Sequence, residues 1–208
     1  TRFPTAPTSI TQTGFTPTGV AVSRTISLGY STQGLVSSIN GPRAPSDPGM
    51  NGLDDVTTLA YYECTTGTAC GQLKTVTNAL GQTTTYGNYT ADGRVQSITD
   101  PNGLVTSYTY DARGRVVSMT LTSSTGVTAT RTFTYTPDGQ VKTLSISPGN
   151  LTYTYGYDAA QYLRTLTDNL GNQVTYTYDL KGNRTSTIVK NPNGTQAQSL
   201  IQAYDLRN

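Results

Sequence analysis

The chain of 208 residues has a formal net charge of +2, and only 12% of its residues are charged. This low charge gives no electrostatic footprint for nucleic acid or for an anionic membrane surface, so no nucleic-acid partner is predicted. No apolar run approaches the ~20 residues that span a bilayer, so we do not expect membrane insertion. Threonine, tyrosine, serine and glycine are abundant, and this composition favours an all-β fold.

Residues 1–23 contain three prolines and several short apolar runs, which we interpret as a lead-in or a degenerate repeat. Residues 24–208 follow a regular pattern and are predicted to form one repeat array. The sequence begins with Thr1 and stops within a repeat, so we expect it to be a segment of a longer protein.

The first readable hairpin has a strand over residues 24–30, a turn at Gly34 and a return strand over residues 35–39. Residues 43–55 are rich in proline and glycine without periodicity, so this part is predicted to be a loop inserted into the array. Strand patterning resumes over residues 56–62 and returns over residues 72–77.

Two cysteines, Cys64 and Cys70, lie six residues apart across Gly67. Where two strands meet, such a pair can reach the ~5.5 Å Cα separation that a disulfide requires. We favour a bridged hairpin tip over two free thiols, and a bridge indicates an oxidising compartment. A zinc site is not predicted, because neither cysteine has a second pair of ligands nearby.

From residue 78 onward the chain repeats every 22 or 23 residues, as the spacing of the glycines in one set of turns shows. These glycines are Gly81, Gly103, Gly126, Gly149, Gly171 and Gly194. A second turn follows four residues after a tyrosine in each repeat. The pattern predicts antiparallel units of two strands of about six residues each.

The tyrosines at the end of each outgoing strand are two residues apart and therefore project to one face of the sheet. If successive repeats stack in register, these side chains form aromatic ladders. On the return strands the apolar residues fall two and five positions after the turn glycine, as in Val141 and Leu144. Either a β-bulge re-aims one residue, or both faces of the sheet are partly covered.

The recurring Tyr-Asp-x-x-Gly element resembles that of the RHS family of YD-repeat proteins over about residues 24–208. It is carried by Tyr110, Asp111 and Gly114, by Tyr157 and Asp158, and by Tyr178, Asp179 and Gly182. Some repeats depart from it: Thr90 and Thr136 replace the aspartate, and Gln161 replaces the glycine.

The resemblance implies an antiparallel β-ribbon that forms a curved, spiralling sheet, as part of a hollow shell. In bacterial toxins and cell-surface proteins of this family, such shells enclose or present a C-terminal effector. The resemblance therefore implies a non-catalytic structural segment of a secreted or cell-surface bacterial protein that encloses or presents a toxin or adhesive module. Its partners would be the remainder of the same RHS protein, or an identical subunit, through open sheet edges, and a toxin cargo.

A second hypothesis is a secreted binding or self-assembling repeat protein that contacts glycans or identical subunits. Catalysis is not expected, because the chain has no histidine for a Ser-His-Asp or Cys-His arrangement. Asp54 and Asp55 could share a proton or bind a cation, but we interpret them as a solvated pair in a loop. The aspartates that recur with the repeat are predicted to have a turn role. No catalytic residue, metal ligand or cofactor site is predicted.

Overall fold

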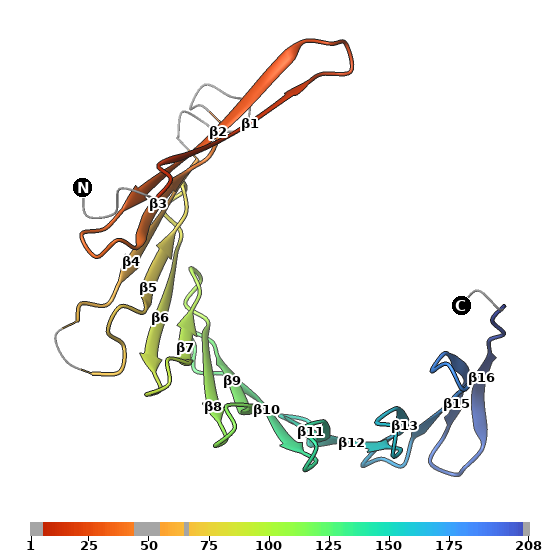
Figure 1. Cartoon of the computed structure of the whole chain (residues 1–208). Coiled ribbons are helices and arrows are strands. Elements are labelled where there is room, and N and C mark those ends of the chain that lie inside the picture. The colour runs from red at the N-terminus through yellow and green to blue at the C-terminus, as the bar shows by residue number, and fades with distance from the viewer. Residues whose placement is uncertain (1–5, 44–54, 65–66, 206–208) are drawn as a thin grey trace. The chain divides into compact units, whose positions relative to one another are not determined.

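A computed structural model describes residues 6–43, 55–64 and 67–205 of the chain (Figure 1). The described residues form sixteen β-strands, which follow one another in the sheet in chain order. The structure describes no helix of the length and apolarity that crossing a membrane would require. The predicted all-β fold of repeated antiparallel two-strand units is confirmed.

The chain divides into two compact units, the first over residues 1–106 and the second over residues 107–208. The strands of the first unit are β1 (Ser9–Phe15), β2 (Ala21–Tyr30), β3 (Val36–Asn40), β4 (Val56–Tyr61), β5 (Leu73–Thr77), β6 (Thr83–Tyr89) and β7 (Val95–Thr99). Strand β8 (Val105–Tyr110) contains the boundary between the units.

The strands of the second unit are β9 (Val116–Thr122), β10 (Thr128–Tyr135), β11 (Val141–Ser147), β12 (Leu151–Tyr157), β13 (Leu163–Asp168), β14 (Gln173–Tyr178), β15 (Arg184–Lys190) and β16 (Gln196–Ile201). Strands β9 to β15 each pair antiparallel with the strand that follows.

One turn geometry connects most of these strands. In the turn after β8, the amide of Asp111 donates to the carbonyl of Arg115 (2.9 Å), and the amide of Gly114 donates back to the carbonyl of Asp111 (2.9 Å). Gly114 has a φ of 76°, which defines a type I turn followed by a left-handed bulge residue. The same two bonds recur in the turns that begin at Thr16, Ser31, Asn78, Thr90, Asp100, Ser123, Thr136, Asp158, Asp168, Asp179 and Asn191.

Every one of these turns begins with Asp, Asn, Ser or Thr. In Asp111 the side-chain oxygen Oδ1 accepts the amides of Arg113 (2.9 Å) and Arg115 (3.0 Å). In Thr136 the hydroxyl accepts the amide of Gln140 (3.1 Å). A short side-chain oxygen is what this turn requires, so threonine can replace the aspartate of the motif without changing the backbone.

The apolar spacing of three on the return strands is explained by a β-bulge. Tyr135 pairs with Val141 and Phe133 pairs with Leu144, because the register shifts by one residue at Lys142. Val141 and Leu144 therefore project to the same face as the two aromatic residues opposite them. Register shifts at the corresponding tyrosines, Tyr30, Tyr61, Tyr157 and Tyr178, repeat this arrangement. Of the two explanations offered by the sequence, the bulge is correct.

The pairing register divides the side chains of the second unit between two faces. One face carries threonine and serine, with cross-strand hydroxyl contacts such as Thr134 to Thr143 (2.6 Å) and Ser145 to Thr152 (3.1 Å). The other face carries the tyrosines and the aliphatic residues. Among the described residues only the apolar side chain of Tyr89 is buried, at 8% exposure, so this sheet has no sealed core of its own.

The prediction of stacked aromatic ladders is wrong in its register. Tyr157 pairs with Leu163, and Tyr155 pairs with Leu166, which in turn pairs with Val174. The reason is that an antiparallel hairpin places a return strand of aliphatic residues between successive tyrosine strands. Rows of tyrosine therefore alternate with rows of leucine and valine on this face.

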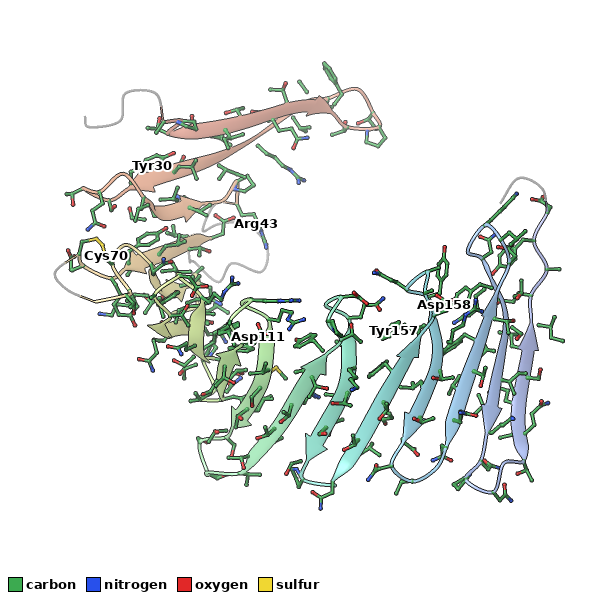
Figure 2. All side chains as sticks on the ribbon, turned by 60° about the horizontal axis from the view of Figure 1, so that its bottom comes forward. Tyr30, Arg43, Cys70, Asp111, Tyr157 and Asp158 are labelled. Atoms are coloured by element: carbon green, nitrogen blue, oxygen red, sulfur yellow. A yellow bond between two sulfur atoms is a disulfide. The ribbon has the colours of Figure 1, made fainter. Side chains whose placement is uncertain are left out.

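The lead-in predicted over residues 1–23 contains β1 and the start of β2. The loop predicted over residues 43–55 lies outside the described residues except for Arg43 and Asp55, whose carboxylate accepts the amide of Arg43 (3.2 Å). Asp54 also lies outside them. The predicted bridge between Cys64 and Cys70 is present, with an S–S distance of 2.01 Å (Figure 2).

The turn geometry can be tested by replacing Gly126 with alanine. Gly126 has a φ of 84°, and an added Cβ would meet no atom within 4 Å. The variant should therefore lose stability through backbone strain alone, by about 1 kcal/mol, as a lower melting temperature in thermal unfolding.

Gly14→Ala is the matched control, because an added Cβ there also meets open space but the backbone of Gly14 is not left-handed. Its melting temperature should stay unchanged or rise slightly. Equal losses in the two variants would contradict the turn assignment.

Candidate functional site

The tyrosine at the end of each outgoing strand fastens its repeat to the previous one. The hydroxyl of Tyr157 donates to the carbonyl of Val141 (2.9 Å), and the hydroxyl of Tyr178 donates to the carbonyl of Leu163 (2.9 Å). In each case the acceptor is the first residue of the preceding return strand. We call this contact the tyrosine brace. It recurs from Tyr61 to Val36, Tyr89 to Leu73, Tyr135 to Val116 and Tyr204 to Arg184.

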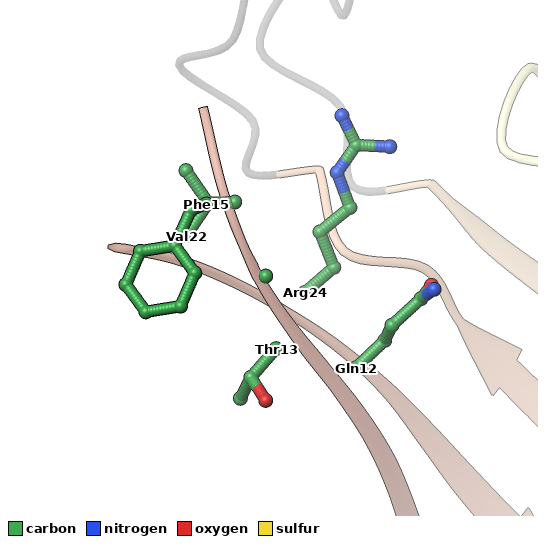
Figure 3. A pocket seen from close by; sticks show the side chains of 6 residues that line it. Gln12, Thr13, Phe15, Val22 and Arg24 are labelled. Carbon is green, nitrogen blue, oxygen red and sulfur yellow. The ribbon is translucent and has the colours of Figure 1, made fainter. Parts of the chain in front are cut away.

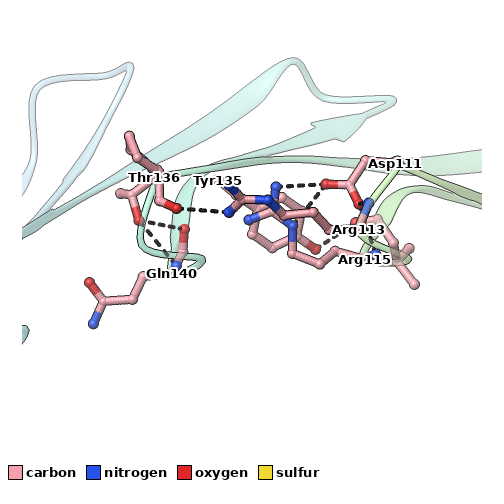
Figure 4. A network of polar contacts seen from close by, with 8 residues as sticks. Asp111, Arg113, Arg115, Tyr135, Thr136 and Gln140 are labelled. Carbon is pink, nitrogen blue, oxygen red and sulfur yellow. Dashed lines mark hydrogen bonds and ion pairs between the residues drawn. The ribbon is translucent and has the colours of Figure 1, made fainter.

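The aspartate that follows the tyrosine organises a charged turn. Asp111 pairs through Oδ2 with the guanidinium of Arg115 (2.7 Å), whose Cζ lies 4.2 Å from the ring centroid of Tyr135 in the next repeat. Arg113 of the same turn donates to the carbonyl of Pro137 (2.8 Å). Figure 4 shows this network. The backbone amide of Arg115 and then its side chain hold the pKa of the Asp111 carboxyl below its usual value.

Two further turns vary this theme. Asp158 pairs with Arg164 (2.6 Å), which lies 5.1 Å from the ring centroid of Tyr178 in the following repeat. Asp179 instead accepts from the side-chain amide of Asn183 (3.0 Å), and this bond is the first cause of its lowered pKa. Each of these aspartates thus accepts hydrogen bonds within its own turn. In the turns of Asp111 and Asp158, the arginine that pairs with the aspartate also contacts the tyrosine ring of the next repeat.

The structure joins the predicted Asp111 and Gly114 within one turn, and it also connects that turn to the next repeat. Asp111 lies in a network with Tyr135, whereas Tyr110, the neighbouring residue in sequence, stacks on Tyr108 at a centroid distance of 6.5 Å. The backbone acceptors of the braces were missed by sequence reasoning. Their signal is an interval of six residues from the tyrosine to the return strand, as from Tyr157 to Leu163, which the hairpin of Tyr61 and Leu73 does not keep.

The polar groups of these turns have a structural role. Their carboxylates are occupied by amides and guanidinium groups of the same turn. The structure describes no group of three or more His, Cys, Asp and Glu side chains that could hold a metal ion.

Shallow hollows lie in the first unit. One, of about 220 Å³, lies at the exposed end of the β1–β2 hairpin between Gln12, Phe15, Val22 and Arg24 (Figure 3). Another, of about 300 Å³, lies beside the disulfide and is lined by Tyr62, Gly67, Thr68, Ala69, Asn88, Tyr89 and Gln96.

Comparison with known sequences identifies the repeat. The RHS Repeat family matches residues 89–128 and 157–196. The tRNA nuclease WapA of Bacillus subtilis is 37% identical over 90 residues, which are 43% of this chain and 4% of WapA. The tRNA3(Ser)-specific nuclease WapA of Bacillus spizizenii matches with the same identity and coverage. The chain thus spans only a small part of the length of these relatives.

Solved structures share the fold. The crystal structure of TcdB2-TccC3-Cdc42 aligns with a TM-score of 0.66 at 17% identity, covering 92% of this chain and 11% of that one. The Tc holotoxin pore of Photorhabdus luminescens aligns with a TM-score of 0.53 at 17% identity, covering 95% of this chain and 13% of that one. At this identity the similarity is one of fold.

The tyrosine brace can be tested with Tyr157→Phe. The variant keeps the ring but loses the hydroxyl that donates to Val141, so it should unfold about 1 kcal/mol more easily in denaturant titration. Tyr155→Phe is the control, since the structure describes no hydrogen bond of its hydroxyl to another described residue. The brace has no energetic value if the two variants unfold at the same denaturant concentration.

The turn carboxylates predict a loss of stability in acid. The folded pKa of Asp179 is lowered below its unfolded value of about 3.9, so its contribution is complete above that pH and is lost as pH falls through the folded pKa. Asp179→Asn keeps an oxygen acceptor but cannot titrate. Its melting temperature should therefore fall less than that of the unmodified chain between about pH 5 and pH 2. Parallel melting curves of the two proteins over that range would disprove this role.

Proposed function

Because the chain belongs to the RHS-repeat family, we propose that it forms a panel in the wall of a larger RHS protein that encloses or presents a toxin or adhesive module. The observation that carries this proposal is a sheet built from copied hairpins, in which both faces remain half-exposed and only Tyr89 is buried among the described residues. Such a sheet gives a surface rather than a compact body, and a surface is what a wall requires.

The braces and charged turns support a mechanical role. Each braced repeat adds the same hydroxyl-to-carbonyl bond to the repeat before it, so stability grows with nearest-neighbour contacts. A turn whose charges are already paired offers no group poised to attack a substrate. The segment therefore contributes support, and any catalytic activity of the whole protein would belong to other parts of it.

The partners follow from the sheet edges. Strand β16 is exposed along its whole length, with Leu200 at 48% and Ile201 at 81% exposure. Unpaired edges of this kind accept a further strand, which the remainder of the same protein would supply. An exposed disulfide fits a secreted or cell-surface protein, because such bridges persist in oxidising surroundings.

The proposal is tested in the natural protein that contains this segment. Deletion of residues 158–178 removes one repeat and joins Tyr157 to Asp179, which restores the Tyr-Asp pair. If the array is a wall, the deletion should leave the strand content by circular dichroism in place and expose the enclosed module to protease. Lys142→Ala, at an exposed bulge position, is the control that should keep the module protected. Unchanged protection after the deletion would refute enclosure.

A second candidate function is self-assembly, which the other edge of the array favours. Strand β1 is exposed throughout and carries neither charge nor proline, the features that usually protect an edge strand. Light scattering of the 208-residue chain should then give a mass that rises with concentration. A monomer at all concentrations would exclude this candidate and leave the wall proposal intact.

A further inference from the structure

The hairpin between β4 and β5 carries an insertion. In the other hairpins the brace tyrosine precedes the first residue of the return strand by six positions, as in Tyr135 and Val141, whereas Tyr61 pairs with Leu73 twelve positions later. The connection between these two strands is therefore six residues longer than in the other hairpins, and it contains the Cys64–Cys70 bridge. We refer to the described residues 63, 64 and 67–71 as the disulfide loop.

The neighbouring strand β6 carries one extra residue opposite this insertion. Its tyrosines, Tyr86 and Tyr89, are three positions apart instead of two, and the added residue Asn88 has a positive φ of 51°. The hydroxyl of Thr68 in the disulfide loop donates to the carbonyl of Tyr89 (2.6 Å). The hydroxyl of Tyr62, beside the loop, donates to the carbonyl of Tyr86 (2.8 Å).

The two irregularities fit each other. The rings of Tyr62 and Tyr89 meet edge to face with centroids 6.2 Å apart. Tyr89 becomes the one buried apolar side chain of the described residues, and this burial raises the pKa of its phenol. The disulfide loop thus lies beside Tyr89 at the joint between the two hairpins, where Gly67, Thr68 and Ala69 line a hollow together with this tyrosine.

We propose that the Cys64–Cys70 disulfide is a thiol-reducible latch, which holds the disulfide loop against the end of β6 at Tyr89 and releases it when a small thiol or a dithiol oxidoreductase reduces the bridge. This inference does not depend on the proposed function. Cys64 and Cys70 are both exposed, so a thiolate can reach the bond from solvent. Exposed disulfides are the class that thiol exchange opens most readily.

The exchange balances with two thiols. A thiolate attacks one sulfur of the bridge and forms a mixed disulfide, while the other cysteine leaves as a thiolate. A second thiol then attacks the mixed disulfide, which frees the first cysteine. The protein gains two thiols, and the two reducing thiols become one disulfide.

Release would stay local, because the loop and the ladder are held by different bonds. Apart from the bridge, Thr68 donates a hydrogen bond to the neighbouring strand. At the base of the loop the amide of Gln72 donates to the carbonyl of Ala69 (2.9 Å), and the amide of Gly71 donates to the carbonyl of Tyr62 (3.0 Å). Strands β4 and β5 pair with each other through their own backbone ladder, which runs from the pair Thr58 and Thr77 to the pair Tyr61 and Leu73. Reduction of the bridge therefore increases the conformational entropy of the loop and leaves the backbone pairs between β4 and β5 in place.

The test is hydrogen exchange of the 208-residue chain with and without dithiothreitol. Reduction should speed exchange of the amides of Gly71 and Gln72 by about tenfold or more, while the amides of β10–β15 keep their rates as an internal control. Cys64→Ser combined with Cys70→Ser should give the same pattern without reductant. Unchanged exchange at Gly71 and Gln72 in the reduced chain overturns the proposal.

Two further measurements distinguish a releasable latch from a structural staple, by which we mean a disulfide that β4 and β5 need in order to stay folded. The pKa of the Tyr89 phenol, read by ultraviolet titration against a Tyr89→Phe reference, should fall toward its ordinary value on reduction. Thr68→Val should enlarge the effect of reduction on Gly71 and leave the oxidised chain little changed. If reduction instead unfolds β4 and β5 together, the bridge is a staple and the latch is disproved.

Discussion

A hydrogen bond from a tyrosine hydroxyl to the first carbonyl of the preceding return strand is the contact on which this architecture depends. The sheet has no second layer among the described residues, so it cannot gain stability by sealing a core. Each hairpin must instead be attached to its neighbour within the plane of the sheet. The tyrosine brace does this at one end of six of the described hairpins, and the alternating tyrosine and aliphatic rows add contact along the face.

The bulge beside each brace explains how the ring and the return strand reach each other. One extra residue, such as Lys142 or Arg164, restores the apolar residues to the tyrosine face and leaves a long cationic side chain at the surface. Arg164 uses that position to join the aspartate of its own turn to the tyrosine of the next. Turn, bulge and brace therefore act as one unit that is copied along the chain.

The regular repeat pattern is interrupted at the disulfide loop. A longer turn in one hairpin and one extra residue in the next compensate each other, and together they bury Tyr89. This joint carries an exposed disulfide, so thiol exchange can change its strength from outside.

Sequence alone determined the repeat, its period and its turns, because these depend on neighbouring residues: an aspartate or threonine at the start, and a glycine such as Gly126 where φ is positive. The bridge between Cys64 and Cys70 was predictable for the same reason. The tertiary structure decided which repeats meet, since strand register places Tyr157 against Leu163 and its hydroxyl on Val141. It also decided that Thr68 bonds to the backbone of Tyr89, because residues 21 positions apart become adjacent only when the hairpins pair.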